Sequence, residues 1–131
     1  MLLPKRYHGF TVVEILIVLI LVAVLTILIT PSFRYYIVRA NRSDAIKSIL
    51  AIQLAEEKYR LSNTTYGTLA QVWSGTDSID GLYTMSVSDN TATAYTITAT
   101  AKTAQSGDSE CTTMTLVYAN GSTTKTPSTC W

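Results

Sequence analysis

The sequence predicts an α+β fold, in which one long N-terminal helix packs on an antiparallel sheet of about four strands. Two observations predict it. Residues 10–61 contain a long apolar run followed by good helix formers, and they include one proline and no glycine. From Tyr83 onward, apolar and polar residues alternate in short segments separated by Asn, Asp and Gly. At 131 residues the chain can bury one small core but not two.

The first part of the helix is an apolar segment of 21 residues, Phe10 to Thr30. At about 1.5 Å per residue, such a helix is roughly 31 Å long, which matches the hydrocarbon core of a bilayer. Lys5 and Arg6 precede the segment and favour a cytoplasmic N-terminus. Because no small-residue cleavage site follows the segment, we expect the chain to retain it. Residues 10–31 are therefore predicted to form the membrane-spanning half of the helix.

The second half of the helix, residues 32–61, carries two apolar stripes on nearly opposite faces. One stripe contains Ile46, Leu50, Leu54 and Leu61, and the other contains Ala45, Ile52, Ala55 and Tyr59. A helix that covers a single core needs only one stripe, so we expect one to face the sheet and the other to face neighbouring molecules. Asp44 with Lys47, and Glu56 with Arg60, are spaced for weak pairs within the helix that we expect to be solvent-exposed.

The second half of the chain is predicted to form the sheet. Residues 62–81 are rich in Ser, Thr, Asn, Gly and Asp, which predicts a loop with one short turn near Leu69. Alternating apolar residues predict strands around 83–87, 95–101 and 114–118. The dipeptide Asn120-Gly121 is typical of a two-residue type I′ turn, which would join the third strand to a fourth in a hairpin.

The same turn predicts a disulfide bond between Cys111 and Cys130. A two-residue turn at Asn120-Gly121 pairs residues whose numbers sum to 241, and the two cysteines meet this condition. Facing residues in such a ladder lie about 4.5–5.5 Å apart, within the range of a disulfide that would contribute about 3 kcal/mol. Pro127 would face residue 114 at a site without a ladder hydrogen bond. Two free thiols in a cytosolic protein are the alternative, which the predicted membrane segment disfavours.

Charge and residue types give no support for catalysis or for a metal site. The formal net charge is +1, and residues 10–131 contain eight Lys or Arg against nine Asp or Glu. Nucleic acid is therefore a possible partner that charge does not support. His8 is the only histidine, and no catalytic set accompanies it. Asp77 and Asp80 could contribute to a calcium site, but these and the other loop acids, Asp108 among them, are better explained as solvated charges.

One carboxylate, Glu14, lies inside the apolar segment, where a charge costs about 2.5–3.5 kcal/mol near the bilayer centre. For a single chain in a membrane, the simpler interpretation is that Glu14 is close enough to the cytoplasmic interface to reach water. A second interpretation starts from cleavage after Gly9, which would create an α-amine on Phe10. Within one helix the amine and the carboxylate could approach each other. A neighbouring subunit shifted along the axis could also offer its amine to this carboxylate, which would neutralise both charges and fix the axial register between subunits.

The segment KRYHGFTVVEILIVL, residues 5–19, resembles the leader and N-terminal helix of type IV pilins and related prepilin-like proteins. It combines a short basic leader, Gly9 before the cut, Phe10 as the new N-terminus, and Glu14 four residues later. The resemblance implies a precursor in the inner membrane of a Gram-negative-type envelope. It also implies cleavage by a prepilin peptidase, N-methylation of Phe10, and transfer through an inner-membrane assembly platform into an extracellular filament of pilin subunits.

Two further features are similar to this family. Pro31 stands where these pilins carry a helix-distorting proline, and the region from Cys111 to Cys130 is similar to the disulfide-closed C-terminus of the type IVa group. Three segments then follow from the resemblance. They are a leader at 1–9, a transmembrane and filament-core half-helix at 10–31, and a globular domain at 32–131.

The expected function is that of a structural type IV pilus subunit in adhesion, twitching motility or DNA uptake, without enzymatic activity, cofactor or metal. His8 would leave with the leader, so the mature chain would have no imidazole. A minor pilin that primes or tips the filament and a type II secretion pseudopilin are alternatives within the family. A DNA-binding pilin and a signal-anchored periplasmic binding module are alternatives from other functional classes.

Overall fold

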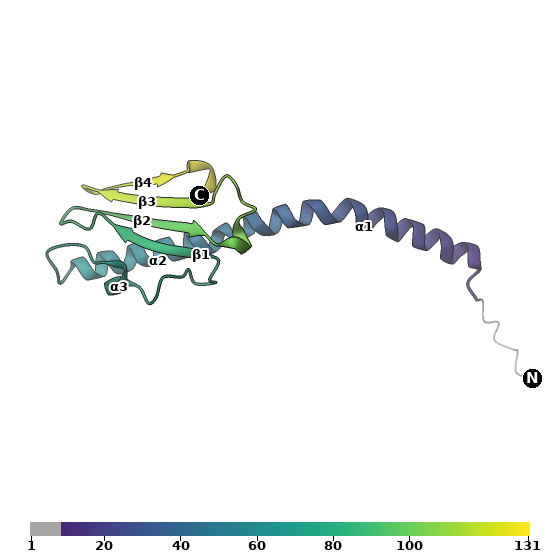
Figure 1. Ribbon diagram of the computed structural model, residues 1–131, viewed down its shortest axis with the longest axis horizontal. Coiled ribbons are helices and arrows are strands. Elements are labelled where there is room, and N and C mark those ends of the chain that lie inside the picture. Colours follow the sequence, from purple (N-terminus) through teal and green to yellow (C-terminus); the bar gives the residue numbers. More distant parts are fainter. Residues whose placement is uncertain (1–8) are drawn as a thin grey trace, which may run out of the picture. The chain divides into compact units, whose positions relative to one another are not determined.

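The computed structural model describes residues 9–131, except for the side chains of residues 28–32. The predicted leader, apart from Gly9, lies outside the described residues. The chain divides into two compact units between Tyr36 and Ile37, and all four strands that the structure describes belong to the second unit (Figure 1). The division predicted at residues 9 and 31 stays a prediction.

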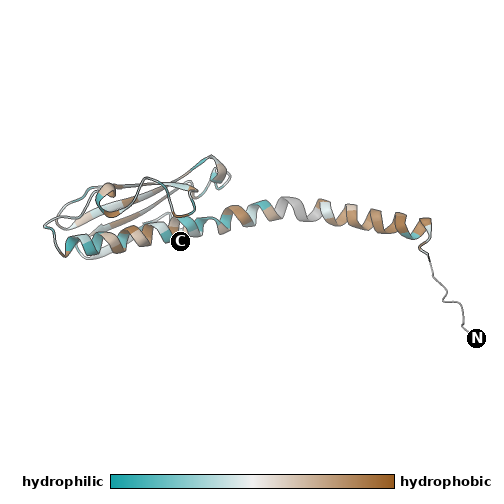
Figure 2. Ribbon diagram, turned by 90° about the horizontal axis from the view of Figure 1, so that it is seen from below, coloured by the Kyte–Doolittle hydropathy of each residue, from teal (hydrophilic) through white to brown (hydrophobic). Residues whose placement is uncertain are grey.

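Helix α1 covers Val12–Ala40, and Figure 2 shows hydrophobic residues along its first part. The Thr11 hydroxyl accepts a hydrogen bond from the Glu14 backbone N–H at 3.2 Å, as an N-cap side chain does. Every side chain from Phe10 to Ile27 is exposed, so this part of the helix buries no core within its own unit. No helix in the described part of the chain combines the length and the apolarity that a bilayer crossing requires.

A single residue, Asn41, separates α1 from helix α2 (Arg42–Arg60), where the sequence predicted one continuous helix. Asn41 keeps helical backbone angles, with φ −66° and ψ −16°. The Gln105 side chain lies at this point: its amide nitrogen donates to the Val38 carbonyl at 2.5 Å, and its amide oxygen accepts from Asn41 Nδ2 at 3.1 Å. In an unbroken helix the Val38 carbonyl accepts from residue 42. A side chain from a distant loop therefore competes for a helical acceptor.

The sheet has four antiparallel strands, as the sequence predicted, and their order is β1-β2-β3-β4. Its strands are β1 (Tyr83–Ser88), β2 (Ala94–Ala101), β3 (Thr113–Ala119) and β4 (Ser122–Thr126). The short helix α3 (Leu69–Val72) confirms the predicted turn, and two 3-10 turns lie at Thr103–Gln105 (η1) and Ser128–Cys130 (η2).

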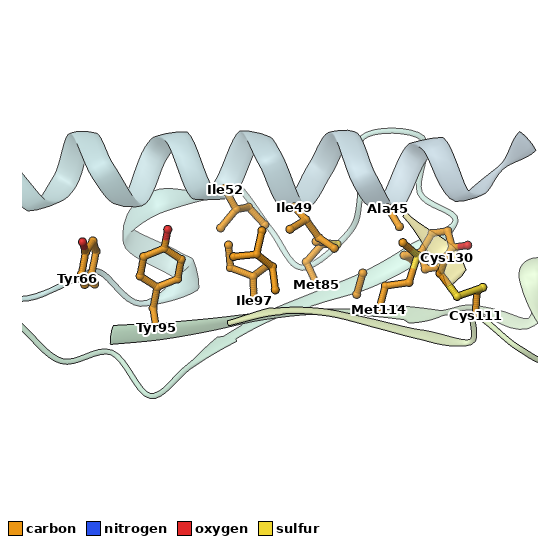
Figure 3. Packing of buried hydrophobic residues seen from close by; sticks show 13 residues of the cluster. Ala45, Ile49, Ile52, Tyr66, Met85, Tyr95, Ile97, Cys111, Met114 and Cys130 are labelled. Atoms are coloured by element: carbon orange, nitrogen blue, oxygen red, sulfur yellow. A yellow bond between two sulfur atoms is a disulfide. The ribbon is translucent and has the colours of Figure 1, made fainter. Parts of the chain in front are cut away.

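The core lies between one face of α2 and one face of the sheet (Figure 3). Ala45, Ile49 and Ile52 from the helix are fully buried and meet alternate residues of the strands, among them Met85 and Ile97. The opposite stripe of α2 is exposed, with Leu50, Leu54 and Leu61 at 44%, 57% and 89%. Ile46, the fourth residue assigned to this stripe, is instead partly buried against the core, so the prediction of two stripes with different environments is confirmed only for the three leucines.

The predicted hairpin register is confirmed, because β3 and β4 pair from Ala119↔Ser122 to Thr115↔Thr126. Cys111 and Cys130 form the predicted disulfide, with α-carbons 5.8 Å apart. They are not ladder partners, however. Pairing ends at Thr126, before Pro127, which has no N–H to donate, and Cys130 lies in η2.

Candidate functional site

The residues predicted to control processing and assembly lie at the start of α1. Gly9, Phe10 and Glu14 are exposed in the single chain, and Phe10 is 76% exposed. Among residues 9–131, no cation forms an ion pair with Glu14. Pro31 lies within the backbone span of α1. The roles of these four residues stay predictions.

Asp44 is buried rather than solvated, so the expected exposed pair with Lys47 is wrong. Its carboxylate accepts hydrogen bonds from the Ser78 hydroxyl at 2.5 Å and from the backbone N–H groups of Asp80 and Leu82 at 2.9 and 3.2 Å. These bonds fix the loop that precedes β1 to the first turn of α2. The helical periodicity of the sequence does not predict these hydrogen bonds, because the donors belong to a loop more than thirty residues away.

Asp108 is also buried, against the expectation of a solvated loop acid. It forms a two-point ion pair with Arg42, with Nε–Oδ2 at 2.6 Å and Nη2–Oδ1 at 2.7 Å. The two side chains are 10% and 5% exposed. The pair joins the loop before β3 to the start of α2, and both charges are compensated at that contact.

Glu56 faces the core, which corrects the expected exposed pair with Arg60. One carboxylate oxygen accepts from the Gly67 N–H at 2.7 Å, while the other, also buried, has no hydrogen-bond partner. Burial raises the pKa of Glu56, although the Gly67 hydrogen bond opposes the shift. Asn90 Nδ2 donates to the Gly67 carbonyl, so the backbone N–H and the backbone carbonyl of Gly67 are both hydrogen-bonded to side chains.

A concave site lies at the end of the sheet where α2 finishes. Its volume is about 350 Å³, and it is formed by Arg60, Tyr66, Tyr118 and two turns at 92–93 and 120–121. The Arg60 guanidinium lies 6.0 Å from the centre of the Tyr66 ring. It also donates from Nε to the Ala92 carbonyl at 3.2 Å and from Nη1 to a second loop carbonyl at 2.6 Å. The sequence indicated only a helix pair for Arg60, because the two turns that complete this site are distant from it in the chain, so the site was not predicted.

Three tyrosines form the inner wall of this pocket and the adjoining core. Tyr118 stacks on Tyr95 with ring centres 5.1 Å apart, and Tyr66 meets both rings edge-on at 4.6 and 5.6 Å. Burial raises the pKa of Tyr66 to about 12 and raises that of Tyr95 as well. Both phenols are therefore neutral at physiological pH, and the positive charge of the pocket belongs to Arg60.

Calcium binding by Asp77 and Asp80 finds no support in the geometry. Asp77 Oδ1 lies 2.7 Å from Lys102 Nζ in an exposed ion pair. Within the part of the chain that the structure describes, no three His, Cys, Asp or Glu residues are grouped as metal ligands.

Comparison with known families identifies the fold. Residues 31–115 match the family described as "Type IV minor pilin ComP, DNA uptake sequence receptor". The chain belongs to this family of minor pilins. Residues 4–30 match the prokaryotic N-terminal methylation motif. The minor pilin thus has the N-terminal motif of a prepilin and the pilin fold of a long N-terminal helix and a four-stranded antiparallel sheet.

The minor pilin is also similar to the type II secretion system core protein G of several bacteria. Identity is 30% over 69 residues with the protein of Dickeya chrysanthemi, which is 53% of this chain and 45% of that protein. Identity is 31% over 67 residues with the protein of Klebsiella pneumoniae, which is 51% of this chain and 48% of that protein. It is 32% over 66 residues with that of Escherichia coli strain K12, covering 50% and 46%. The minor pilin spans less than half the length of these relatives.

These findings refine the expected function. The family is one of minor pilins, so the alternative of a minor pilin is better supported than that of a main structural pilus subunit. Pilins are structural proteins without enzymatic activity, as expected. The relationship to type II secretion pseudopilins is also established by the similarity to core protein G.

Proposed function

We propose that this minor pilin is exposed on a type IV filament, where it binds DNA and takes part in DNA uptake. The observation that carries the proposal is the family match over residues 31–115, since that family is described as a DNA uptake sequence receptor. The match includes α2, β1, β2 and the start of β3, which supports a role for the globular unit rather than the N-terminal motif alone.

The burial of several acidic residues changes the charge balance that gave no support for DNA binding. Residues 37–131 contain seven Lys or Arg and eight Asp or Glu. Three of these acids but only one of the bases are buried, namely Asp44, Glu56, Asp108 and Arg42. Six basic and five acidic residues are not buried. The net charge is therefore negative when all ionisable residues of this range are counted, but positive when only those that are not buried are counted. Phosphate recognition depends on where the cations lie, which the total charge does not report.

The test is duplex DNA binding by the full processed chain in neutral detergent micelles, measured from low to physiological salt. Contacts to phosphates release counterions, so we expect the affinity to fall as salt rises. A sequence receptor should also prefer some fragments of its own genome over shuffled duplexes of the same composition. Lack of DNA binding even at low salt would contradict the proposal.

For assembly, we propose that cleavage after Gly9 and methylation of Phe10 precede filament entry, and that Glu14 pairs with the α-amine of a neighbouring subunit. The methylation motif at residues 4–30 supports this. Glu14→Ala should leave the precursor stable in the membrane and reduce its incorporation, while Glu14→Asp, which keeps the charge, should reduce it less. Mass spectrometry of sheared filaments measures both. An unmodified N-terminus, or normal incorporation of Glu14→Ala, would contradict the proposal.

The exposed stripe of α2 supports packing against other pilin subunits. Leu50, Leu54 and Leu61 lie on one helix face, and the described chain covers none of them with its own core. Replacing Leu54 by Ser should reduce incorporation without destabilising the isolated subunit, because its side chain is 57% exposed. Lys58→Ser, at an exposed polar position of the same helix, is the control, and an equal loss in both variants would argue against a leucine contact.

A secretion pseudopilin is the second candidate, supported by the identity of 30–32% to core protein G in three bacteria. The two functions differ in what a gene deletion abolishes. If deletion stops protein secretion and leaves DNA uptake intact, the pseudopilin is the correct function. The opposite result favours the DNA receptor.

A further inference from the structure

We propose that the pocket formed by Arg60, Tyr66 and Tyr118 binds one backbone phosphate of DNA. The inference rests on the proposed function and deepens it by assigning a contact site. The pocket has a volume of about 350 Å³, near the lower end of the range for small-ligand sites. It is large enough for a phosphate group with part of its sugar.

Arg60 supplies the charge that a phosphate requires. Among the residues that the structure describes, no carboxylate forms an ion pair with it. Its bonds to the carbonyls of Ala92 and Asn63 use two of the five N–H donors of a guanidinium. A planar guanidinium can present two parallel donors to a phosphate, which an ammonium group cannot do.

The pocket is also held in shape before any ligand arrives. The two hydrogen bonds to loop carbonyls and the Tyr66 ring fix the position of Arg60. The Asn120 N–H donates to the Thr93 carbonyl at 2.9 Å, which ties together the two turns that form the rim. Fixed groups lose little conformational freedom on binding, so a preformed cation contributes more to affinity than a mobile one.

The aromatic residues favour a phosphate over a stacked base. Tyr118 already stacks on Tyr95, with planes 15° apart, and Tyr66 is buried edge-on to both rings. Proteins that bind single strands offer aromatic faces to successive bases. Here the rings pack mainly against one another, and the cation is the group at the pocket that is suited to recognition.

The test compares Arg60→Ala with Lys58→Ala in the full processed chain, using a labelled duplex and fluorescence anisotropy. Both residues lie in the last turn of α2 and both changes remove one positive charge, but Lys58 is exposed and is not among the pocket residues. Arg60→Ala should weaken binding about tenfold or more and lower the salt slope by about 1, equally for two duplex sequences. Lys58→Ala should change the affinity less than about threefold.

A second pair of variants guards against a folding defect, since Arg60→Ala also removes the bonds to two loops. Arg60→Lys keeps the positive charge but loses the two parallel donors of the guanidinium. It should therefore weaken binding, while Lys58→Arg should not. Thermal unfolding of each variant checks the fold. Equal losses at the two positions, with wild type binding intact, would overturn the phosphate site and leave the DNA function standing. Lack of binding by wild type would instead overturn the function itself.

Discussion

The buried ion pair between Arg42 and Asp108 provides a sharp test of how the globular unit is stabilised. Asp108→Ala leaves the Arg42 guanidinium, whose side chain is 10% exposed, without its carboxylate. Removing one partner of a buried pair costs about 3–5 kcal/mol. That is a large part of the roughly 5–15 kcal/mol that stabilises a domain of this size. At about 4–8 °C per kcal/mol, the melting temperature should fall by at least about 12 °C.

Tryptophan fluorescence is a suitable assay, because both tryptophans, Trp73 and Trp131, belong to the unit that contains the pair. The matched control is Asp77→Ala, which breaks the ion pair with Lys102. In this ion pair the Lys102 side chain is 35% exposed and the Asp77 side chain is 57% exposed. An exposed pair contributes only about 0–1 kcal/mol, so the control should unfold close to wild type.

A double variant separates the loss of a charge from the loss of a pair. Arg42→Met with Asp108→Leu removes both charges and leaves apolar groups in their place, so it should recover much of the stability lost by Asp108→Ala. The reasoning is refuted if Asp108→Ala costs no more than Asp77→Ala. It is also refuted if the double variant is less stable than the single one, because the loss of one partner of the buried pair would then not be the cause.

Three other substitutions test separate features. Burial raises the pKa of Glu56 above its ordinary value of 4.5, so the folded state holds this proton more tightly than the unfolded state and stability falls as pH rises through the folded pKa. Glu56→Gln should remove that fall above pH 4.5, and an unchanged pH profile of the melting temperature would contradict it. Gly67→Ala should cost about 1–3 kcal/mol in urea unfolding, because its Cβ would lie 2.8 Å from Val72 Cγ1. Cys130→Ser should cost about 3 kcal/mol under oxidising conditions, and a loss that persists under reducing conditions would point to packing rather than the cross-link.

The hairpin and its disulfide could be predicted because the constraint on them is local. Asn120-Gly121 admits few turn types, and a two-residue turn sets the register of every later pair. Asn120 and Gly121 indeed have φ of 50° and 84°. The sequence did not show where the ladder ends, since Pro127 and the following 3-10 turn carry Cys130 away from the strand while keeping it within reach of Cys111.

The buried acids were harder to predict, and for different reasons. Glu56 lies at helical spacing from Ala45, Ile49 and Ile52, so the sequence contained a sign that it faces the core. Asp108 offered no such sign, because a loop has no periodicity and its partner Arg42 is 66 residues away. The break at Asn41 was unpredictable for the same reason, since it involves a glutamine from another loop.

The acids of this chain differ in where their partners come from. Asp108 is compensated by Arg42, Asp44 by a hydroxyl and two backbone N–H groups, and Glu56 in part by one N–H. In each case the globular unit supplies the partner, because a buried carboxylate without one would cost several kcal/mol. Glu14 lies among exposed apolar side chains on α1, and the described chain offers it no cation. If packing covers those side chains in a filament, as proposed above, the same rule predicts that Glu14 pairs with a cation of a neighbouring subunit, so the Glu14→Ala experiment tests assembly rather than folding.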